Sequence, residues 1–147
     1  MIPACLSQFA MPPCAALLGA EILDADTARG WVRIRFLGRE AFLNPSGHVQ
    51  GGLVTAMLDD TMGPAVLVAT AGAQMPVTIT LTTTFLKPAP PGPLIGEATV
   101  LKLGRSIGHV AAVLTDPAGE ELARASASVR LVPVPAATAG GGDPASA

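Results

Sequence analysis

The chain has 147 residues, of which 50% are hydrophobic and 14% charged, and its formal net charge at pH 7 is −2. This length suits one domain with a substantial core and is too short for two domains. So small a net charge gives no electrostatic case for nucleic acid or an anionic membrane as a partner, and the apolar composition indicates that further surface is hidden in an oligomer.

The N-terminal segment is apolar, but it contains no Lys or Arg within twenty residues and three prolines interrupt it. A secretion signal needs a basic start and an uninterrupted apolar stretch. We therefore expect no secretion signal here, and a cytoplasmic location is predicted. The two cysteines, Cys5 and Cys14, are too few for a disulfide framework or a metal site, and reduced thiols fit that compartment.

Two strands are predicted next, over Ala20 to Asp26 and Trp31 to Leu37, joined by a turn that contains Gly30. In the second strand apolar and basic residues alternate, which is typical of a strand with one buried face. The pair is predicted to form a hairpin.

The segment 44–70 combines a polar loop, a Gly-Gly pair and a long apolar run. A helix is predicted from Gly51 to about Ala69. Apolar residues occupy nearly all of its sides, which is typical of a buried core helix. Pro64 lies inside this helix and removes one of its hydrogen bonds, so a local kink is expected there.

Two adjacent acids, Asp59 and Asp60, interrupt this apolar helix. Because burial penalises a charged group, they need a polar cavity, a partner or a raised pKa. Alternatively, they face solvent at a helix edge or cap the break near Pro64. Together with Pro64 they interrupt the only long apolar segment, so no membrane span is predicted.

The first amides of the helix carry the positive end of its dipole, which makes the Gly51 N–H a candidate oxyanion donor. Gly51 precedes Asp59 by eight residues, which is about 12 Å of helix. One helix cannot bring both groups to one carbonyl carbon. They can cooperate if two helices lie antiparallel in a two-fold dimer, so a homodimer or a dimer of dimers with composite sites is predicted.

Four strands are predicted after the helix. In the first, which ends at Phe85, alternation directs Val77, Ile79 and Leu81 toward the core and a ladder of threonines, beginning with Thr78, toward the other face. Such a threonine surface suits a subunit contact as well as solvent.

The remaining strands are predicted over 94–103, 106–115 and 121–131, and small residues on the inner face of the last one leave room for a helix. Short turns make the strands antiparallel, and the long helix is buried only if the sheet curls around it. The predicted class is therefore α+β, with one domain over residues 1–132 and a disordered Ala/Gly/Pro-rich tail over 133–147.

Asn44, Gly47, Gly51-Gly52 and Asp59, followed by the later Phe-Leu-Lys-Pro-Ala and Gly92, resemble the hotdog-fold acyl-CoA thioesterases of the phenylacetate-degradation type. Their signature is N-x-x-G-x-x-H-G-G, then six residues, then D. The resemblance, which covers about residues 11–133, implies a curved antiparallel sheet wrapped around one long helix. It also implies hydrolysis of an acyl- or aryl-CoA thioester, without a metal or another cofactor.

The resemblance also implies roles for single residues. Asp59 would act as base or nucleophile, with Gly51 as oxyanion donor. Asn44 would orient the partner carboxylate or the water, and Thr78 would position water. Alternatively, Asn44 is a turn residue before Pro45 and Thr78 is one rung of the threonine ladder.

Gln50 departs from the signature, because it stands where these enzymes usually have His. An amide can donate a hydrogen bond to a thioester carbonyl, but it cannot change charge as His does. Gln50 therefore preserves the function if hydrogen bonding suffices. His48 is expected to be a loop or helix-entry residue, and His109 is expected to serve packing or an interface.

A CoA substrate carries phosphates, so basic residues are expected at the entrance of the site. The candidates are Lys87, Lys102, Arg105 and Ser106, the last two in a turn that resembles the one contacting CoA in relatives. Scattered solvating charge explains them equally well.

Two other functions remain open. Gln50 makes a non-catalytic acyl-CoA binding protein of the same fold plausible. An enoyl-CoA hydratase or dehydratase is disfavoured. Hotdog enzymes of that kind have a D-x-x-x-x-H pattern in the loop and helix, and here no such His follows Asp59 or Asp60.

Overall fold

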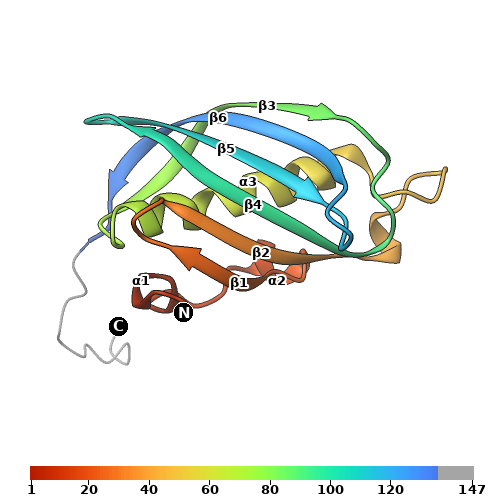
Figure 1. Ribbon diagram of the computed structural model, residues 1–147, viewed down its shortest axis with the longest axis horizontal. Helices are drawn as coiled ribbons and strands as arrows, with labels where there is room; N and C mark the ends of the chain where they lie inside the picture. Colours follow the sequence, from red (N-terminus) through yellow and green to blue (C-terminus); the bar gives the residue numbers. More distant parts are fainter. Residues whose placement is uncertain (136–147) are drawn as a thin grey trace, which may run out of the picture.

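The computed structural model describes residues 1–135 of the chain, in which one curved sheet wraps around a long helix (Figure 1). The elements in chain order are α1 (Ala4–Ser7), α2 (Pro13–Leu17), β1 (Glu21–Asp26), β2 (Trp31–Gly38), a 3₁₀ turn η1 (Glu40–Phe42), α3 (Gly51–Ala69), β3 (Gln74–Phe85), β4 (Gly92–Leu103), β5 (Ile107–Thr115) and β6 (Glu121–Pro133).

The six strands form a single sheet in the order β1-β2-β4-β5-β6-β3, and every neighbouring pair is antiparallel. The prediction of an antiparallel sheet around one central helix is confirmed. The last strand extends through Pro133, the first residue of the predicted tail, and residues 136–147 of that tail lie outside the described part of the chain.

The central helix begins and ends where the sequence predicts, and it continues through Pro64. Its core-facing side chains, among them Met57, Leu58 and Met62, are fully buried against the concave face of the sheet. Helix and sheet approach closely at Gly96, where a Cβ atom would lie 2.5 Å from the Thr61 hydroxyl oxygen. A side chain at position 96 would therefore push α3 away from β4.

The inner face of β6 is lined by buried small side chains, as predicted. By length and composition α3 is also apolar enough to cross a membrane, contrary to the prediction from its acids and proline, and half of its most apolar window is buried inside the domain. It is the core helix around which the sheet closes.

The prediction of which β3 side chains face the core is wrong at the start of the strand. Val77 and Ile79 are 54% and 55% exposed rather than buried, while the side chain of Thr78 points toward α3. The register of β3 against β6 shifts between Thr78 and Thr80, which marks a bulge at Ile79. Because the bulge inserts one residue, Thr78 before it and Leu81 after it both lie on the inner face.

The N-terminal segment folds against the central helix and the first strands and contributes two short helices, α1 and α2. Leu18 is buried and Leu6 packs against the same core. The segment therefore covers one side of α3 that the sheet leaves open (Figure 1).

Candidate functional site

The two helix acids lie on one stripe of α3 that faces a cavity. The stripe consists of residues three, four or eleven positions apart, which share one side of a helix. Its members are Ala56, Asp59, Asp60, Gly63 and Leu67. The acids therefore interrupt the apolar core on a single side.

Thr78 and Asp59 are joined directly across this cavity. The Thr78 hydroxyl donates a hydrogen bond of 2.9 Å to Oδ1 of Asp59. Both side chains are exposed in a single chain, so a substrate or water can reach the carboxylate. This contact places Thr78 on the inner side of β3, beside Asp59, rather than on an outer threonine ladder.

Asp60 has a different environment from its neighbour. It is half-buried, and this burial, together with the adjacent charge of Asp59, raises the pKa of its carboxyl group. The expectation that a buried acid in this helix needs a raised pKa is therefore met at Asp60. The two carboxyl groups differ in exposure and in hydrogen bonding, which is how neighbouring acids acquire different chemical roles.

The cavity beside the acids has a volume of about 480 Å³. Its walls come from α3, the start of β3, β1 and β2, and the N-terminal segment, which contributes Phe9, Met11 and Leu18. Apolar side chains dominate these walls, as in most small-molecule sites. Composition alone did not reveal this cavity, because four segments distant in sequence build it.

The second group of predicted residues gathers at the start of α3. Gln50 is the N-cap residue, and its Oε1 accepts hydrogen bonds from the N–H groups of Gly52 and Leu53, at 2.7 and 3.3 Å. Within residues 1–135 its Nε2 donates no hydrogen bond. The N–H of Gly51 has no hydrogen-bond acceptor within residues 1–135, so this donor can serve a bound oxyanion.

Asn44 orders the loop before the helix. Its Oδ1 accepts hydrogen bonds from the N–H groups of Ser46 and His48, at 2.9 and 3.2 Å. Its side-chain oxygen thus orders the turn, and its Nδ2 has no acceptor in the part of the chain that the structure describes. His48 lies in the same loop, as predicted for a helix-entry residue.

A cleft of about 530 Å³ lies between this loop and the segment that follows β3. Asn44, Gly51, Phe85 and Lys87 all line it. The Phe85 ring packs over Gly51, where a Cβ atom would lie only 3.2 Å from Cζ. Lys87 forms an ion pair with Glu120, so its ammonium group is already partly neutralised.

The structure does not bring the two groups of residues together within one chain. Asp59 and Thr78 face one cavity, whereas Asn44 and Gly51 line another. The prediction that a complete site needs a second helix stays a prediction, because the structure describes a single chain.

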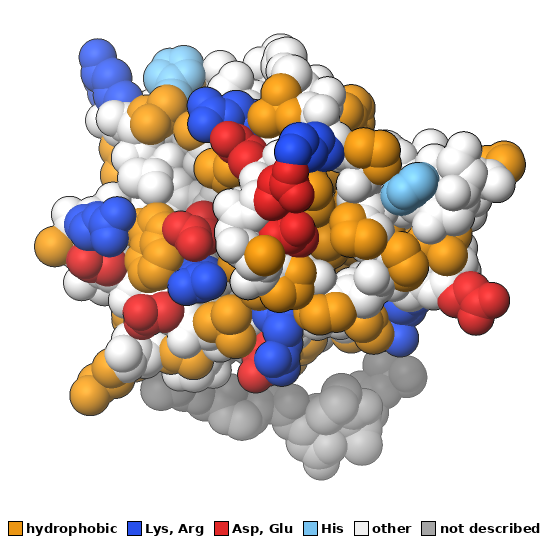
Figure 2. Space-filling model, turned by 45° about the vertical axis from the view of Figure 1, so that its right-hand side comes forward, with side chains coloured by type: hydrophobic (Ala, Val, Ile, Leu, Met, Phe, Trp, Pro, Cys, Tyr) orange, Lys and Arg blue, Asp and Glu red, His pale blue; other side chains and the backbone are white. Residues whose placement is uncertain are grey.

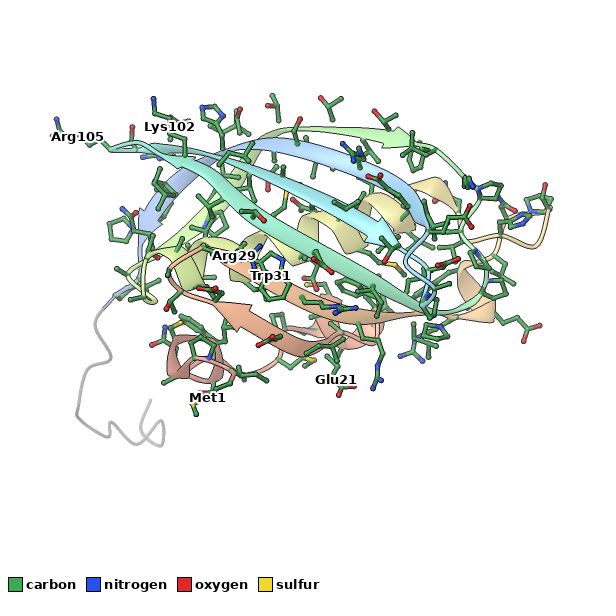
Figure 3. All side chains as sticks on the ribbon, viewed as in Figure 1. Met1, Glu21, Arg29, Trp31, Lys102 and Arg105 are labelled. Atoms are coloured by element: carbon green, nitrogen blue, oxygen red, sulfur yellow. The ribbon has the colours of Figure 1, made fainter. Side chains whose placement is uncertain are left out.

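The remaining predicted CoA contacts lie far from Lys87. Lys102 and Arg105 are at the tip of the β4–β5 hairpin, at the end of the molecule opposite the start of α3 (Figure 3). Ser106 follows Arg105 in the same turn, and its carbonyl accepts a hydrogen bond from the N–H of Leu131.

Two further residues near this hairpin, His109 and Arg130, were not among the predicted CoA contacts. His109 pairs with Lys102 across β4 and β5, and Arg130 pairs with Ile107 across β5 and β6. The strand register shows which residues neighbour them, and no local period in the sequence does so. Elsewhere on the face shown in Figure 2, acidic and basic side chains are interspersed with hydrophobic ones.

Comparisons with a family profile and with solved structures both lead to thioesterases. The sequence profile described as Thioesterase superfamily matches residues 46–123. A phenylacetic acid degradation-related protein of Ralstonia eutropha JMP134 has 32% identity and a TM-score of 0.80, over 86% of this chain and 96% of that one. No curated protein matches the chain.

Two other solved structures share the fold. A thioesterase family protein from Silicibacter pomeroyi has 26% identity and a TM-score of 0.77, over 88% of this chain and 96% of that one. A Streptococcus mutans UA159 protein bound to acetyl-CoA has 20% identity and a TM-score of 0.69, over 78% and 89% of the two chains.

Proposed function

Since this chain belongs to the thioesterase superfamily and is a hotdog-fold thioester hydrolase, we propose that its substrates are acyl- or aryl-CoA thioesters. One observation carries the proposal: an exposed carboxylate, held by the Thr78 hydroxyl, faces an apolar cavity large enough for an acyl group. The Streptococcus mutans structure with acetyl-CoA shows that a protein of this fold accommodates such a ligand.

The chemistry follows from the two groups of residues. As a base, Asp59 takes a proton from water while the water oxygen adds to the thioester carbonyl carbon. The Gly51 N–H stabilises the resulting oxyanion. Collapse of the intermediate breaks the C–S bond, and the products are a carboxylic acid and the protonated thiol of CoA. As a nucleophile, the Asp59 carboxylate instead adds to the carbonyl carbon and expels the CoA thiolate, which takes up a proton, and water then cleaves the resulting mixed anhydride to the carboxylic acid and free Asp59.

We propose that the complete site forms between two subunits. The outer edge of β3 has no strand partner in the described chain, it carries no charged residue, and it exposes Met75, Val77, Ile79 and Phe85. A long apolar edge of this kind is a template for pairing with another chain. Antiparallel pairing of two β3 strands about a two-fold axis also sets the two α3 helices antiparallel, in a homodimer or a dimer of dimers.

This arrangement assigns roles to the remaining site residues. The free Nε2 of Gln50 donates a hydrogen bond to the substrate carbonyl beside Gly51, and the free Nδ2 of Asn44 orients the partner carboxylate or the attacking water. Thr78 holds the carboxylate of Asp59. The oxygens of Gln50 and Asn44 are occupied by backbone N–H groups, which fixes the direction of both amides.

Antiparallel helices also bring opposite ends of two subunits together. The β4–β5 hairpin of one subunit, with Lys102, Arg105 and Ser106, then lies at the same end as Lys87 of the other. These groups fit the phosphates of CoA. A cytoplasmic location fits such a substrate.

A non-catalytic acyl-CoA binding protein is the second candidate, because Gln50 replaces the expected His. One experiment separates the two. Thiol release from acetyl-, octanoyl-, benzoyl- and phenylacetyl-CoA is followed with a chromogenic disulfide, for the wild type and for Asp59→Asn. We expect release by the wild type and a loss of about 10²–10⁴-fold in kcat for the variant. Binding of all four without thiol release would support the non-catalytic candidate.

Asp60→Asn is the matched control, because it changes the neighbouring acid on the same helix. It is expected to retain activity, with an unchanged far-ultraviolet circular dichroism spectrum for both variants. If Asp60→Asn is the inactive variant and Asp59→Asn is active, the assignment of the catalytic acid is wrong.

A further inference from the structure

We infer that the cavity beside Asp59 receives an uncharged apolar acyl group and that Gly63 determines how long this group can be. The inference rests on the proposed acyl-CoA thioesterase function and specifies its substrate class. It starts from the position of the cavity relative to the reacting carboxylate.

The cavity extends from Asp59 mainly in one direction. On α3 it is lined by one residue before the acids, Ala56, and by Gly63, Pro64 and Leu67 after them. The start of β3, which follows the C-terminal end of α3, closes the same end. An acyl chain whose carbonyl carbon lies at Asp59 therefore runs along the helix toward its C-terminal end.

Gly63 lies on this path, one helical turn beyond Asp59. Four residues along a helix correspond to about 6 Å, so a two-carbon acyl group ends before Gly63, while a chain of six or more carbons passes it. A Cβ atom at Gly63 would meet no other atom within 4 Å. The space above this glycine is open cavity.

Glycine in the interior of a helix is unfavourable relative to alanine, and no packing contact of Gly63 requires its small size. This distinguishes it from Gly96, where a side chain would collide with Thr61. The consequence of glycine at position 63 is an unobstructed cavity. A side chain there would occupy the volume that a longer acyl chain needs.

The chemistry of the walls determines the kind of acyl group. Apart from the two acids and Thr78, the lining is mainly apolar, with side chains such as Phe9, Met11 and Leu67. An acyl chain with a terminal carboxylate would lose its hydration there without gaining a cationic partner. Asp60, half-buried at the same wall, adds repulsion. The cavity therefore favours hydrocarbon or aryl acyl groups.

The test compares acetyl-, hexanoyl- and decanoyl-CoA in the wild type, Gly63→Ala and Gly63→Val. We expect kcat/KM for acetyl-CoA to change less than about twofold, and kcat/KM for decanoyl-CoA to fall by about 10–200-fold in Gly63→Val. Gly63→Ala should have a smaller effect and a thermal unfolding midpoint at or above that of the wild type, because alanine favours the helix.

Ala111→Leu is the matched control. It adds as many carbon atoms as Gly63→Val, but on the outer face of the sheet, beside Thr82 and Arg124. The ratio of decanoyl- to acetyl-CoA activity should not change in this variant. Equal loss of both substrates in Gly63→Val, or no loss of either, would overturn the inference.

Binding separates this inference from the proposed function. The thioether analogue S-decyl-CoA cannot be hydrolysed, so calorimetry measures its affinity whether or not the protein is catalytic. We expect Gly63→Val to weaken S-decyl-CoA binding by about 10–200-fold and S-ethyl-CoA binding by less than about twofold. If the wild type binds these analogues with this pattern but releases no thiol, the proposed catalysis fails while the acyl cavity stands.

Discussion

The hydroxyl of Thr78 and the carboxylate of Asp59 form a 2.9 Å hydrogen bond that joins the start of β3 to the middle of α3. It fixes one carboxylate oxygen and leaves the other available for water or a thioester carbonyl. A hydrogen bond from a fixed side chain to a catalytic carboxylate limits its rotation, and small misplacements of reacting groups are costly in rate.

This relationship predicts the effect of changing Thr78. Thr78→Val keeps the shape of the side chain and removes the donor, so kcat should fall by about tenfold, the effect of losing about 1.4 kcal/mol of transition-state stabilisation. Thr78→Ser keeps the donor and should retain most of the rate. Steady-state kinetics on both variants measures this, and equal activity of Val and Ser would show that the hydrogen bond is dispensable.

The raised pKa of Asp60 predicts that the free energy of unfolding depends on pH. Because its folded-state pKa is raised by burial and by Asp59, its contribution to stability is full below the pKa of an unfolded aspartate, about 3.9. This contribution is lost as pH rises through the raised folded pKa. Asp60→Asn removes the titration, so its stability advantage over the wild type should be larger at pH 7 than at pH 4.

Denaturant unfolding at the two pH values measures this difference. A stability difference for Asp60→Asn that is equal at both pH values would contradict the prediction.

The composite site predicts complementation between two inactive variants. Gly51→Val places a side chain against the Phe85 ring and should disturb the oxyanion donor, while Asp59→Asn removes the acid. In a mixed dimer, one site combines the intact Asp59 of one chain with the intact Gly51 of the other. After co-refolding at equal concentrations, about a quarter of the wild-type activity should return, since half of the dimers are mixed and each has one intact site.

Each variant refolded alone is the control and should stay inactive. Size-exclusion chromatography with light scattering checks that both variants assemble as the wild type does. No recovery of activity in the mixture, with dimers present, would place both groups of one site in the same chain or separate their roles.

Gln50 predicts two separable effects. Gln50→Ala removes the Oε1 acceptor that caps α3, so the free energy of unfolding should fall by about 1 kcal/mol, and loss of Nε2 should lower kcat as well. Gln50→His restores the residue of the signature and should raise kcat. This gain in kcat should be absent when Gln50→His is combined with Asp59→Asn. A higher kcat in the double variant than in Asp59→Asn alone would indicate a different reaction path.

The sequence determined the central helix and the overall class of the fold. The Gly-Gly pair, the apolar residues on all sides of α3 and the turns between the strands are local signals, and helix and strand periods follow from backbone geometry alone. The same local reasoning located Asp59 in the helix and the free N–H of Gly51 at its start. The eight-residue spacing also predicts a site shared between two chains, which the complementation experiment tests.

Only the tertiary structure decided which way Thr78 points and what surrounds the acids. Simple alternation along β3 put Thr78 outside, and the bulge at Ile79, which is defined by pairing with β6, reversed this. The cavity that ends beyond Gly63 is built by α3, two parts of the sheet and the N-terminal segment. Such features depend on contacts between residues distant in the chain, and no local period encodes them.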